Sequence, residues 1–389
     1  MGAPATARRI GPERKAGAEP QVVSRPLSVT WLPSAAHIHS LAGEWLELEA
    51  AVRDRTVFSS FDYLVTWYRH YAGSFGGDPL IGIARRGPRL VGVAPLVARR
   101  GRMGKIPVTR LEFALHGAYA GEFLVENEGE DIIRAFIDSL VSTVRFDLIC
   151  LNGFDSRSER FRTIAGAAAR RGLMMETTNH PNAVVDLSGG YDGYCRAMSR
   201  NFRRTLKRQA QRVASAGVPA VDGVHLTSGL DDLDRSIERL FSITEASYKL
   251  QGASLAGRHR DSLAELATRF GPRGMLELSL LAIGGRDAAV VMGLVERGCY
   301  YDVTLAYVDA FADLSPGSYL IQEVLRKLAA AGVHTFVSHG AHEYKRRWAT
   351  AFVPSTRVFL FMPGIRASVA RFVRFTLRPI WRRFGALEP

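Results

Sequence analysis

The 389-residue sequence has few cysteines and no long apolar run, and each absence removes a class of protein. Its three cysteines, Cys150, Cys195 and Cys299, show neither disulfide-type pairing nor metal-type spacing, so we expect buried thiols and no disulfide. The histidines are scattered, and we expect no metal. No run of about 18 uncharged apolar residues is present, which argues against a membrane-spanning helix.

The N-terminus lacks the apolar centre of a secretory signal peptide. Arg8, Arg9, Arg14 and Lys15 stand there among Gly, Ala and Pro, a composition that does not support a packed core. We therefore expect residues 1–25 to form a disordered basic tail on a cytoplasmic protein.

Acidic residues are outnumbered by basic ones. The chain has 51 Lys and Arg against 38 Asp and Glu, a formal net charge of +13 at pH 7. Such a surplus attracts phosphates, nucleic acid or an anionic membrane surface, without choosing among them. With 47% hydrophobic residues, the chain is long and apolar enough for two domains of ordinary size.

The most informative stretch is residues 275–350. Its pattern predicts two adjoining strands, a third strand, a turn at residues 314–318, a helix and a fourth strand. Small residues in the turn would let backbone N–H groups at the start of the helix face outward, where the helix dipole helps to bind an anion. An ordinary Pro-Gly turn with a serine cap is the alternative. The helix is predicted from an apolar face at helical spacing: Leu320, Ile321, Val324, Leu325 and Leu328.

The first half of the chain repeats this succession. A hairpin over residues 80–99, a strand near residues 110–115, a helix with one apolar side and a buried strand at residues 146–151 follow in the same order. We interpret this as a diverged duplication that gives an α/β (α+β) protein of two tandem modules, each a mixed central sheet flanked by helices. The helix in the first half opens with carboxylates that would repel a phosphate, so we assign any phosphorylated donor to the second half. These carboxylates are Glu126, Glu128, Glu130 and Asp131.

The predicted module boundary is the Ser-Gly-Gly turn at residues 188–190. It divides an N-terminal module, residues 26–187, from a C-terminal module, residues 188–362. Residues 363–389 then interleave apolar and basic residues. This C-terminal tail either lies on an anionic membrane or docks as a helix on its own domain.

The helix after the boundary carries a basic side that includes Arg203 and Arg204. A solvated face and an anion-binding face both agree with such a stripe. Arginine offers a bidentate fork to phosphate or carboxylate, whereas lysine gives a point charge, and the choice between the two readings stays open on the residues alone.

Three motifs in this order resemble acetyltransferases of the GNAT fold, more closely the CelD/BcsL type named for cellulose and exopolysaccharide biosynthesis. They are Phe202-Arg203-Arg204, Ser315-Pro316-Gly317, and Gly340 followed by Tyr344-Lys345. The resemblance implies acetyl-CoA or another acyl-CoA as donor, and a substrate-binding role for Arg203 and Arg204. It places Tyr344 and Lys345 among the catalytic residues. The implied donor site comprises Thr304, Leu305 and Ala306 along the third strand, then Ser315, Pro316, Gly317, Ser318, Tyr319 and Leu320.

The sequence departs from this family at two places. The phosphate loop keeps a single glycine, and Phe336 stands where related sequences often have an aspartate. The remaining candidates for the base are His339, whose imidazole titrates near neutral pH, and Asp302, whose burial would raise its pKa. A satisfied histidine and a solvent-facing carboxylate are the alternatives.

The leading functional hypothesis is an acyl-CoA-dependent N- or O-acyltransferase acting on a glycan, exopolysaccharide or envelope precursor, in the cytoplasm and peripheral to the inner membrane. A Fem-like ligase that takes its acyl group from aminoacyl-tRNA is a second reading, which the positive charge favours. A non-catalytic GNAT-like adaptor at the membrane surface is a third. Binding of CoA or strongly salt-dependent binding of tRNA discriminates the first two.

Overall fold

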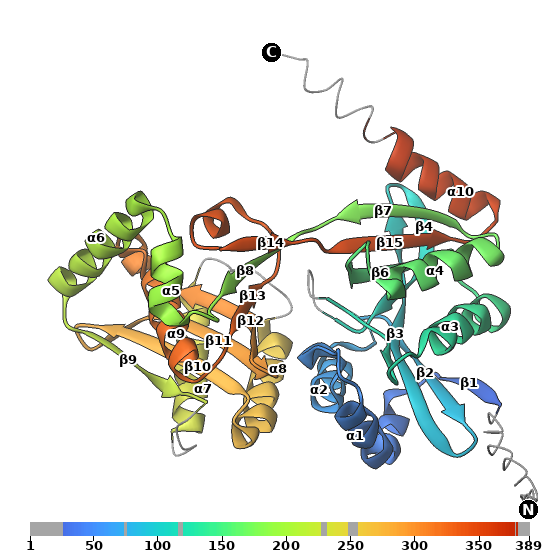
Figure 1. The fold of residues 1–389 in the computed structure, drawn as a ribbon, viewed down its shortest axis with the longest axis horizontal. Helices are drawn as coiled ribbons and strands as arrows, with labels where there is room; N and C mark the ends of the chain where they lie inside the picture. The colour runs from blue at the N-terminus through green and yellow to red at the C-terminus, as the bar shows by residue number, and fades with distance from the viewer. Residues whose placement is uncertain are drawn as a thin grey trace, which may run out of the picture.

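The computed structural model describes residues 26–73, 76–115, 120–226, 232–247, 256–377 and 379. Two mixed β-sheets, each flanked by helices, form the body of the protein (Figure 1), which confirms the expected fold class. The tail expected at residues 1–25 lies outside the described residues. Within the described part, no helix is long and apolar enough to cross a bilayer.

The first sheet has the strand order β1-β2-β3-β4-β6-β15-β7. Strands β1 to β4 form an antiparallel meander, β4 and β6 are parallel, and β15 is antiparallel to both β6 and β7. Short β5 (Leu124–Val125) pairs with β3. The other strands are β1 (Leu27–Leu32), β2 (Asp78–Arg86), β3 (Arg89–Met103), β4 (Ile106–Phe113), β6 (Leu148–Phe154), β7 (Met174–Asn179) and β15 (Thr356–Phe361).

The second sheet, read from its other end, has the order β9-β10-β11-β12-β13-β8-β14. Again four antiparallel strands lead to a parallel pair, here β12 and β13, and two further antiparallel strands follow. The repeated order agrees with an internal duplication. The strands are β8 (Asn182–Asp186), β9 (Pro219–Val224), β10 (Leu276–Ile283), β11 (Arg286–Glu296), β12 (Cys299–Tyr307), β13 (Thr335–Ser338) and β14 (Ala351–Val353).

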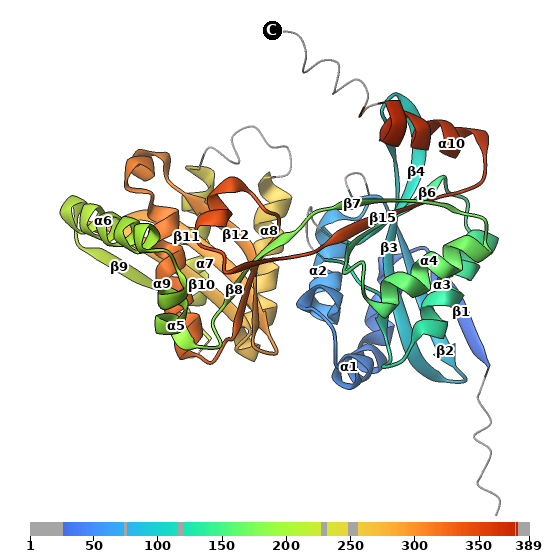
Figure 2. The ribbon, with the colours of Figure 1, turned by 45° about the horizontal axis from the view of Figure 1, so that its top comes forward.

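The two sheets exchange one strand each. Beside β6 lies β15, from the C-terminal end of the chain, and beside β13 lies β8, which directly follows β7 of the first sheet. Figures 1 and 2 show these crossings, β7 to β8 and β14 to β15, running between the two sheets. The boundaries predicted at residues 187/188 and 362/363 therefore assign β8 and β15 to the wrong sheets. An apolar strand pattern identifies a strand but does not tell which sheet it joins.

Helices cover both sheets and also meet between them. Helix α2 lies beside α8, and one apolar core runs from α1 and α2 through α7 and α8 to the second sheet. The aromatic residues of α2 are buried in this core. The described α-helices are α1 (Ala42–Ala51), α2 (Phe61–Tyr71), α3 (Glu130–Thr143), α4 (Glu159–Arg170), α5 (Gly190–Ala197), α6 (Arg200–Ala216), α7 (Leu233–Glu245), α8 (Ala256–Phe270), α9 (Pro316–Ala330) and α10 (Ile365–Phe372).

The C-terminal tail begins by docking on its own protein. Ala367 and Ala370 of α10 are buried against Phe359 and Phe361 of β15, and a π-helical turn, Val373–Leu377, follows. The opposite side of α10 exposes an apolar stripe: Ile365, Val369 and Phe372. Residue 378 and residues 380–389 of the predicted tail lie outside the described part.

A buried ion network joins the two halves near α1. The Arg55 guanidinium lies 2.5 Å from one carboxylate oxygen of Glu296, at the end of β11, and 3.5 Å from Glu49 on α1. The Glu49 carboxylate also accepts a hydrogen bond from the backbone N–H of Phe61. Burial raises the pKa of Glu49 from its ordinary 4.5 to about 7.

Replacing Leu360 on the exchanged strand β15 tests whether this strand supports the first sheet. Leu360→Ala removes a fully buried side chain between β6 and β7, and we expect a loss of about 2–5 kcal/mol in unfolding free energy. Native-state hydrogen exchange should show weaker protection in β6 and β7 as well as in β15. Val353→Ala, at a half-exposed position on neighbouring β14, is the matched control. Loss of protection confined to β15 would contradict this role.

The Glu49 carboxylate should make stability depend on pH. Because its pKa is raised in the folded state, its stabilising contribution is present below pH 4.5 and is lost as the pH rises through about 7. We expect the unfolding free energy of the wild type, relative to Glu49→Gln, to fall by about 2–3 kcal/mol over this window. Urea denaturation at several pH values measures it. Glu47→Gln, exposed on the same helix, should leave the wild-type profile unchanged.

Candidate active site at the start of helix α9

Helix α9 begins at a turn that α6 holds in place. Ser315, the residue before the helix, adopts φ 53° and ψ 52°, a left-handed conformation that residues other than glycine rarely take. Its carbonyl accepts hydrogen bonds from the N–H groups of Ser318 and Tyr319 at 3.1 and 3.3 Å. It also accepts one at 2.6 Å from the side-chain amide of Gln209, a buried residue of α6. The predicted apolar face of α9 is buried throughout.

Gly317 allows the helix start to approach strand β12. A Cβ atom at this position would lie 3.3 Å from Cδ2 of Leu305, closer than most carbon contacts. Two residues predicted for the donor site, Leu305 on the strand and Gly317 on the helix, are therefore packed against each other.

A cleft of about 500 Å³ opens between α6, the start of α9 and the 3-10 turn Glu343–Arg347. It brings together three residues predicted for the site, Ser315, Ser318 and Tyr344, although they are up to 29 positions apart in the sequence. Its other lining residues include Phe202, Gln209, Arg212, Gln322, Arg346 and Arg347.

Three arginines make the cleft positive. Arg212 donates a hydrogen bond to the carbonyl of Asp313, just before the turn, and Arg346 lies over the ring of Phe352. With Arg347, they surround a helix N-terminus, which itself favours anions. The sequence prediction missed these residues. Along α6, helical steps of three or four residues place one group of side chains on the same side of the helix: Phe202, Thr205, Gln209 and Arg212. In the sequence, this spacing is the only indication that Arg212 lies on the side that faces the cleft.

The predicted substrate residues Arg203 and Arg204 do not line this cleft. Arg203 donates to the carbonyls of Cys195 and Arg196 at 3.1 and 3.3 Å, so it caps the C-terminal end of α5. Arg204 is exposed. Both lie on a different side of α6 from Thr205 and Gln209, because successive residues of a helix turn by about 100°.

Strands β12 and β13, which lie behind the start of α9, part toward their ends. The parallel pairing of β12 with β13 extends only over residues 299–301, while β12 stays paired with β11 to Tyr307. The register of β11 and β12 shifts opposite Val303. Thr304, Leu305 and Ala306 thus lie beyond the last described pairing with β13, at the position predicted for the donor arm.

Asp302 stands where these strands part. Its carboxylate accepts a 2.7 Å hydrogen bond from the hydroxyl of Ser338, the last residue of β13. Asp302 is partly buried and Ser338 is fully buried. Neither residue is among those that line the cleft, and the role of Asp302 as base stays a prediction.

His339 and Lys345 are packed into the protein interior. The His339 ring contacts Phe58 of the first half, with centroids 5.4 Å apart, and burial together with nearby Lys345 lowers the pKa of His339 to about 3. An imidazole with so low a pKa is a weak proton acceptor at neutral pH, and His339 does not line the cleft, so its predicted role as base is not favoured. The Lys345 ammonium donates to the His339 carbonyl at 2.7 Å and fixes this loop. Only Tyr344, about half exposed, faces the cleft.

Comparison with known proteins places this cleft within one family domain. Residues 200–346, which carry α6, α9 and the turn with Tyr344, match the acetyltransferase (GNAT) domain family. This range covers all but three of the cleft-lining residues, Ser199, Arg347 and Trp348. No curated protein sequence matches the chain.

Three solved structures share the fold along most of the chain. FemX aligns with a TM-score of 0.58 and 10% identity over 86% of this chain and 98% of that one. A putative lysylphosphatidylglycerol synthetase C-terminal domain from Agrobacterium fabrum gives 0.51 and 14% over 87% and 95%. L-PGS from Bacillus licheniformis gives 0.52 and 10% over 88% and 96%. The chain thus has a fold of two GNAT-like modules, the second matching a transferase domain, while membership of the CelD/BcsL type stays a prediction.

The low pKa of His339 gives a direct test of its environment. Because burial disfavours the imidazolium, we expect the ring NMR signals of His339 to stay those of a neutral imidazole from pH 8 down to pH 5. Exposed His342, three residues along the chain, provides the internal reference in the same spectra. A His339 titration centred near pH 6.5 would show that the ring is solvated, and would restore it as a candidate base.

Proposed function

We propose that the chain transfers an acyl group from an acyl-CoA, such as acetyl-CoA, to an amine or hydroxyl of a glycan or other envelope precursor. The observation that carries this proposal is the cleft. In it the start of α9 adjoins three arginines, and Gly317 at this helix start packs against Leu305 on the parted end of β12. Such a site suits a long substrate with a phosphate group at one end and an extended arm at the other.

The residues present fit the phosphates of CoA. Arg212, Arg346 and Arg347 would supply guanidinium groups, and α9 would supply the positive end of its dipole. The family's loop has more glycines, but Ser315 itself takes the left-handed conformation that glycine usually supplies. The missing glycine is therefore no obstacle to the turn.

The chemistry requires few side chains, because a thioester is already activated. The acceptor nitrogen or oxygen would attack the thioester carbonyl, the C–S bond would break, and the proton lost by the acceptor would leave with the thiol. Asp302 is the preferred base on geometry, since Ser338 holds it at the parting of β12 and β13. Tyr344 would orient or protonate a group in the cleft.

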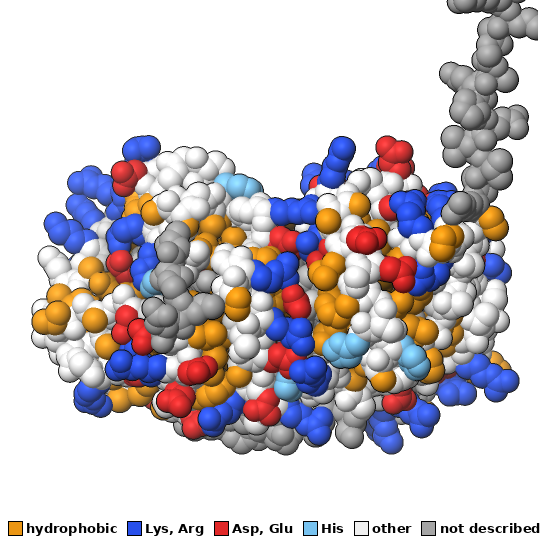
Figure 3. All heavy atoms as spheres, turned by 90° about the horizontal axis from the view of Figure 1, so that it is seen from below, with side chains coloured by type: hydrophobic (Ala, Val, Ile, Leu, Met, Phe, Trp, Pro, Cys, Tyr) orange, Lys and Arg blue, Asp and Glu red, His pale blue; other side chains and the backbone are white. Residues whose placement is uncertain are grey.

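An aminoacyl-tRNA-dependent reaction is the second candidate. The favouring observation is the exposed basic side of α6, which includes Arg200, Arg204 and Arg208. Figure 3 shows Lys and Arg side chains gathered at the end of the molecule that carries α6. The fold shared with FemX is compatible with this reading.

A peripheral position at the inner membrane is part of the leading proposal, and the exposed apolar stripe of α10 supports it.

Binding of the donor separates these readings. We expect CoA and acetyl-CoA to raise the melting temperature, and Arg212→Ala and Arg346→Ala each to weaken CoA binding about tenfold, the effect of losing one hydrogen bond to a charged group. Arg204→Ala, exposed on the same helix but outside the cleft, is the matched control. Titration calorimetry measures the affinities.

Other outcomes of this experiment are equally informative. Tight, steeply salt-dependent tRNA binding with no effect of CoA would overturn the acyl-CoA proposal in favour of the second candidate. Absence of both would leave the non-catalytic adaptor. Tyr344→Phe and Asp302→Asn should reduce acyl transfer while CoA binding stays within about twofold of wild type, because neither side chain is assigned to the phosphates.

A further inference from the structure

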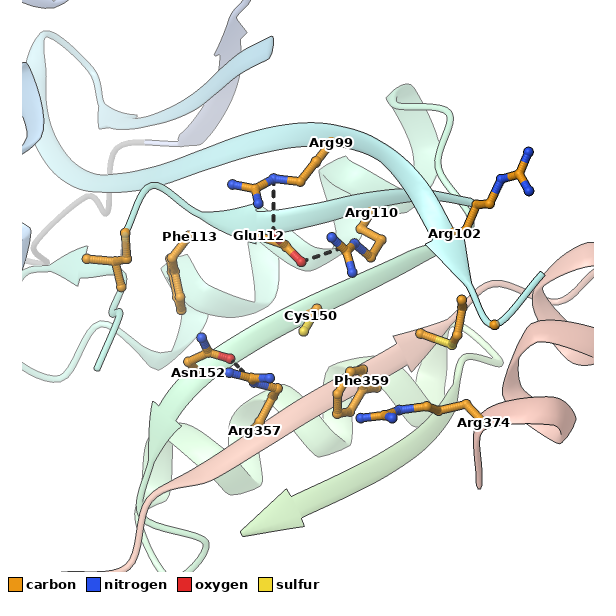
Figure 4. Close-up of a pocket in the computed structure, with 13 residues that line it drawn as sticks. Arg99, Arg102, Arg110, Glu112, Phe113, Cys150, Asn152, Arg357, Phe359 and Arg374 are labelled. Atoms are coloured by element: carbon orange, nitrogen blue, oxygen red, sulfur yellow. Dashed lines mark hydrogen bonds and ion pairs between the residues drawn. The ribbon is translucent and has the colours of Figure 1, made fainter. Parts of the chain in front are cut away.

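A second pocket, of about 350 Å³, lies on one face of the first sheet. Four adjacent strands, β3, β4, β6 and β15, each send side chains into it (Figure 4). Residues at alternate positions of a strand point to the same face of the sheet. The register between the paired strands therefore decides which side chains meet in the pocket. The projecting residues are Arg99, Arg110, Glu112, Cys150, Asn152, Arg357 and Phe359, and Arg374 adds a side chain from the turn after α10.

The pocket concentrates positive charge. Four of these residues are arginines, against the single carboxylate of Glu112. Arg99 and Arg110 are direct partners across β3 and β4, and like charges at facing positions destabilise a sheet. Glu112 offsets part of this repulsion, because its oxygens lie 3.5 and 3.1 Å from the Nε atoms of Arg99 and Arg110. A substantial excess of positive charge remains.

Two guanidinium N–H groups in the pocket lack a well-aligned hydrogen-bond acceptor, although both lie near Glu112. The Nε atoms of Arg99 and Arg110 are buried, and among the described residues neither has an acceptor in hydrogen-bonding geometry. Leaving a buried donor unsatisfied costs about 1–3 kcal/mol, and more when the group is charged. By contrast, Arg357 is oriented by Asn152, whose side-chain oxygen accepts from its Nε at 2.5 Å. An anion between these arginines would remove both the repulsion and the unsatisfied donors.

The remaining lining residues do not equip the pocket for nucleophilic catalysis. Burial raises the pKa of Cys150, on the pocket floor, to about 12, so the thiol stays protonated and is a poor nucleophile. Phe359 adds an apolar surface beside it. Arg102 also belongs to the lining, but Figure 4 shows its guanidinium directed away from the centre. The pocket is therefore suited to binding a ligand rather than to nucleophilic catalysis.

The acidic helix start in the first half does not oppose an anion here. Glu126 and Asp131 are paired with Arg86 at 3.1 and 2.6 Å, and Glu126 also with Arg89. Helix α3 packs on the opposite face of the sheet from Cys150 and Phe359. The expectation that the start of α3 repels phosphate stays a prediction, and it does not bear on this pocket on the other face of the sheet.

We propose that this pocket binds the phosphate group of a phosphorylated small molecule or of an anionic lipid head group. Guanidinium groups bind phosphate oxygens in pairs, and the positive excess suits a dianion better than a monocarboxylate. The pocket volume lies in the range of small-molecule sites. It shares no lining residue with the cleft at α9, so this proposal stands independently of the acyltransferase function.

Titration calorimetry of the full chain with pyrophosphate and with uridine diphosphate, and flotation with phosphatidylglycerol or phosphatidylcholine vesicles, tests the proposal. We expect binding of at least one phosphate probe, with Arg110→Gln and Arg357→Gln each weakening it tenfold or more. Arg102→Gln, at the rim, should bind within about twofold of wild type. Binding to soluble probes alone assigns a soluble phosphate, and binding to phosphatidylglycerol vesicles alone assigns a head group.

A measurement on the unmodified chain covers the case in which a variant fails to fold. Burial lowers the pKa of His180, and Arg357 and Arg374 lower it further. A phosphate bound between these arginines should raise the pKa of His180 in NMR titrations. No binding by any probe at millimolar concentration in low salt, or binding that Arg110→Gln and Arg357→Gln leave unchanged, would overturn the proposal.

Discussion

The structure depends on two extended crossings between the sheets. Because β8 leaves the first half to lie beside β13, and β15 returns from the second half to lie beside β6, neither sheet is complete without chain from the other. The shared core of α1, α2, α7 and α8 adds apolar burial to these backbone ladders. Pairings this distant in sequence form late, so the first sheet closes only when the C-terminal strand is available. The halves are thus expected to unfold together.

This coupling also reaches the candidate active site. The loop between β13 and the cleft carries His339, whose ring contacts Phe58 of the first half, and it ends in the turn with Tyr344. Lys345 ties the same loop to the His339 carbonyl. The position of Tyr344 in the cleft is therefore set partly by packing against the other half. The second module cut out alone at the predicted boundary would lose this support as well as β8.

Local patterns predicted the second half well. The helical spacing from Leu320 to Leu328, the turn at Ser315 and the order of strands around them are all present, since each depends on contacts within one continuous stretch. The resemblance gave the correct fold class and, with Ser315, Ser318 and Tyr344, part of the cleft lining. These predictions rest on helix and strand periods, which single segments display.

The predictions failed where the outcome is set by partners distant in the sequence. Nothing in residues 356–361 indicates that they pair with β6, and only helical spacing distinguishes Arg212 from Arg203 as a cleft residue. The orientation of α6 is fixed by the bond from Gln209 to Ser315, 106 residues away. His339 was a reasonable base in sequence terms, and its environment is decided by Phe58 and by burial. The roles of charged and titratable residues depend most on such tertiary contacts, because burial and neighbouring charges set their pKa values.

The two halves share one topology but differ in where they present positive charge to an anion. In the second half, Ser315 adopts a left-handed backbone conformation and Gly317 has no side chain. The start of α9 that they form borders a cleft lined by arginines. In the first half, the equivalent helix start is occupied by its own carboxylates, paired with Arg86 and Arg89. Positive charge appears there on the other face of the sheet, between β3 and β15. Because one site uses a helix dipole and the other uses strand register, a mutation can alter either without disturbing the other, which is the condition for a duplicated fold to acquire two separate ligands.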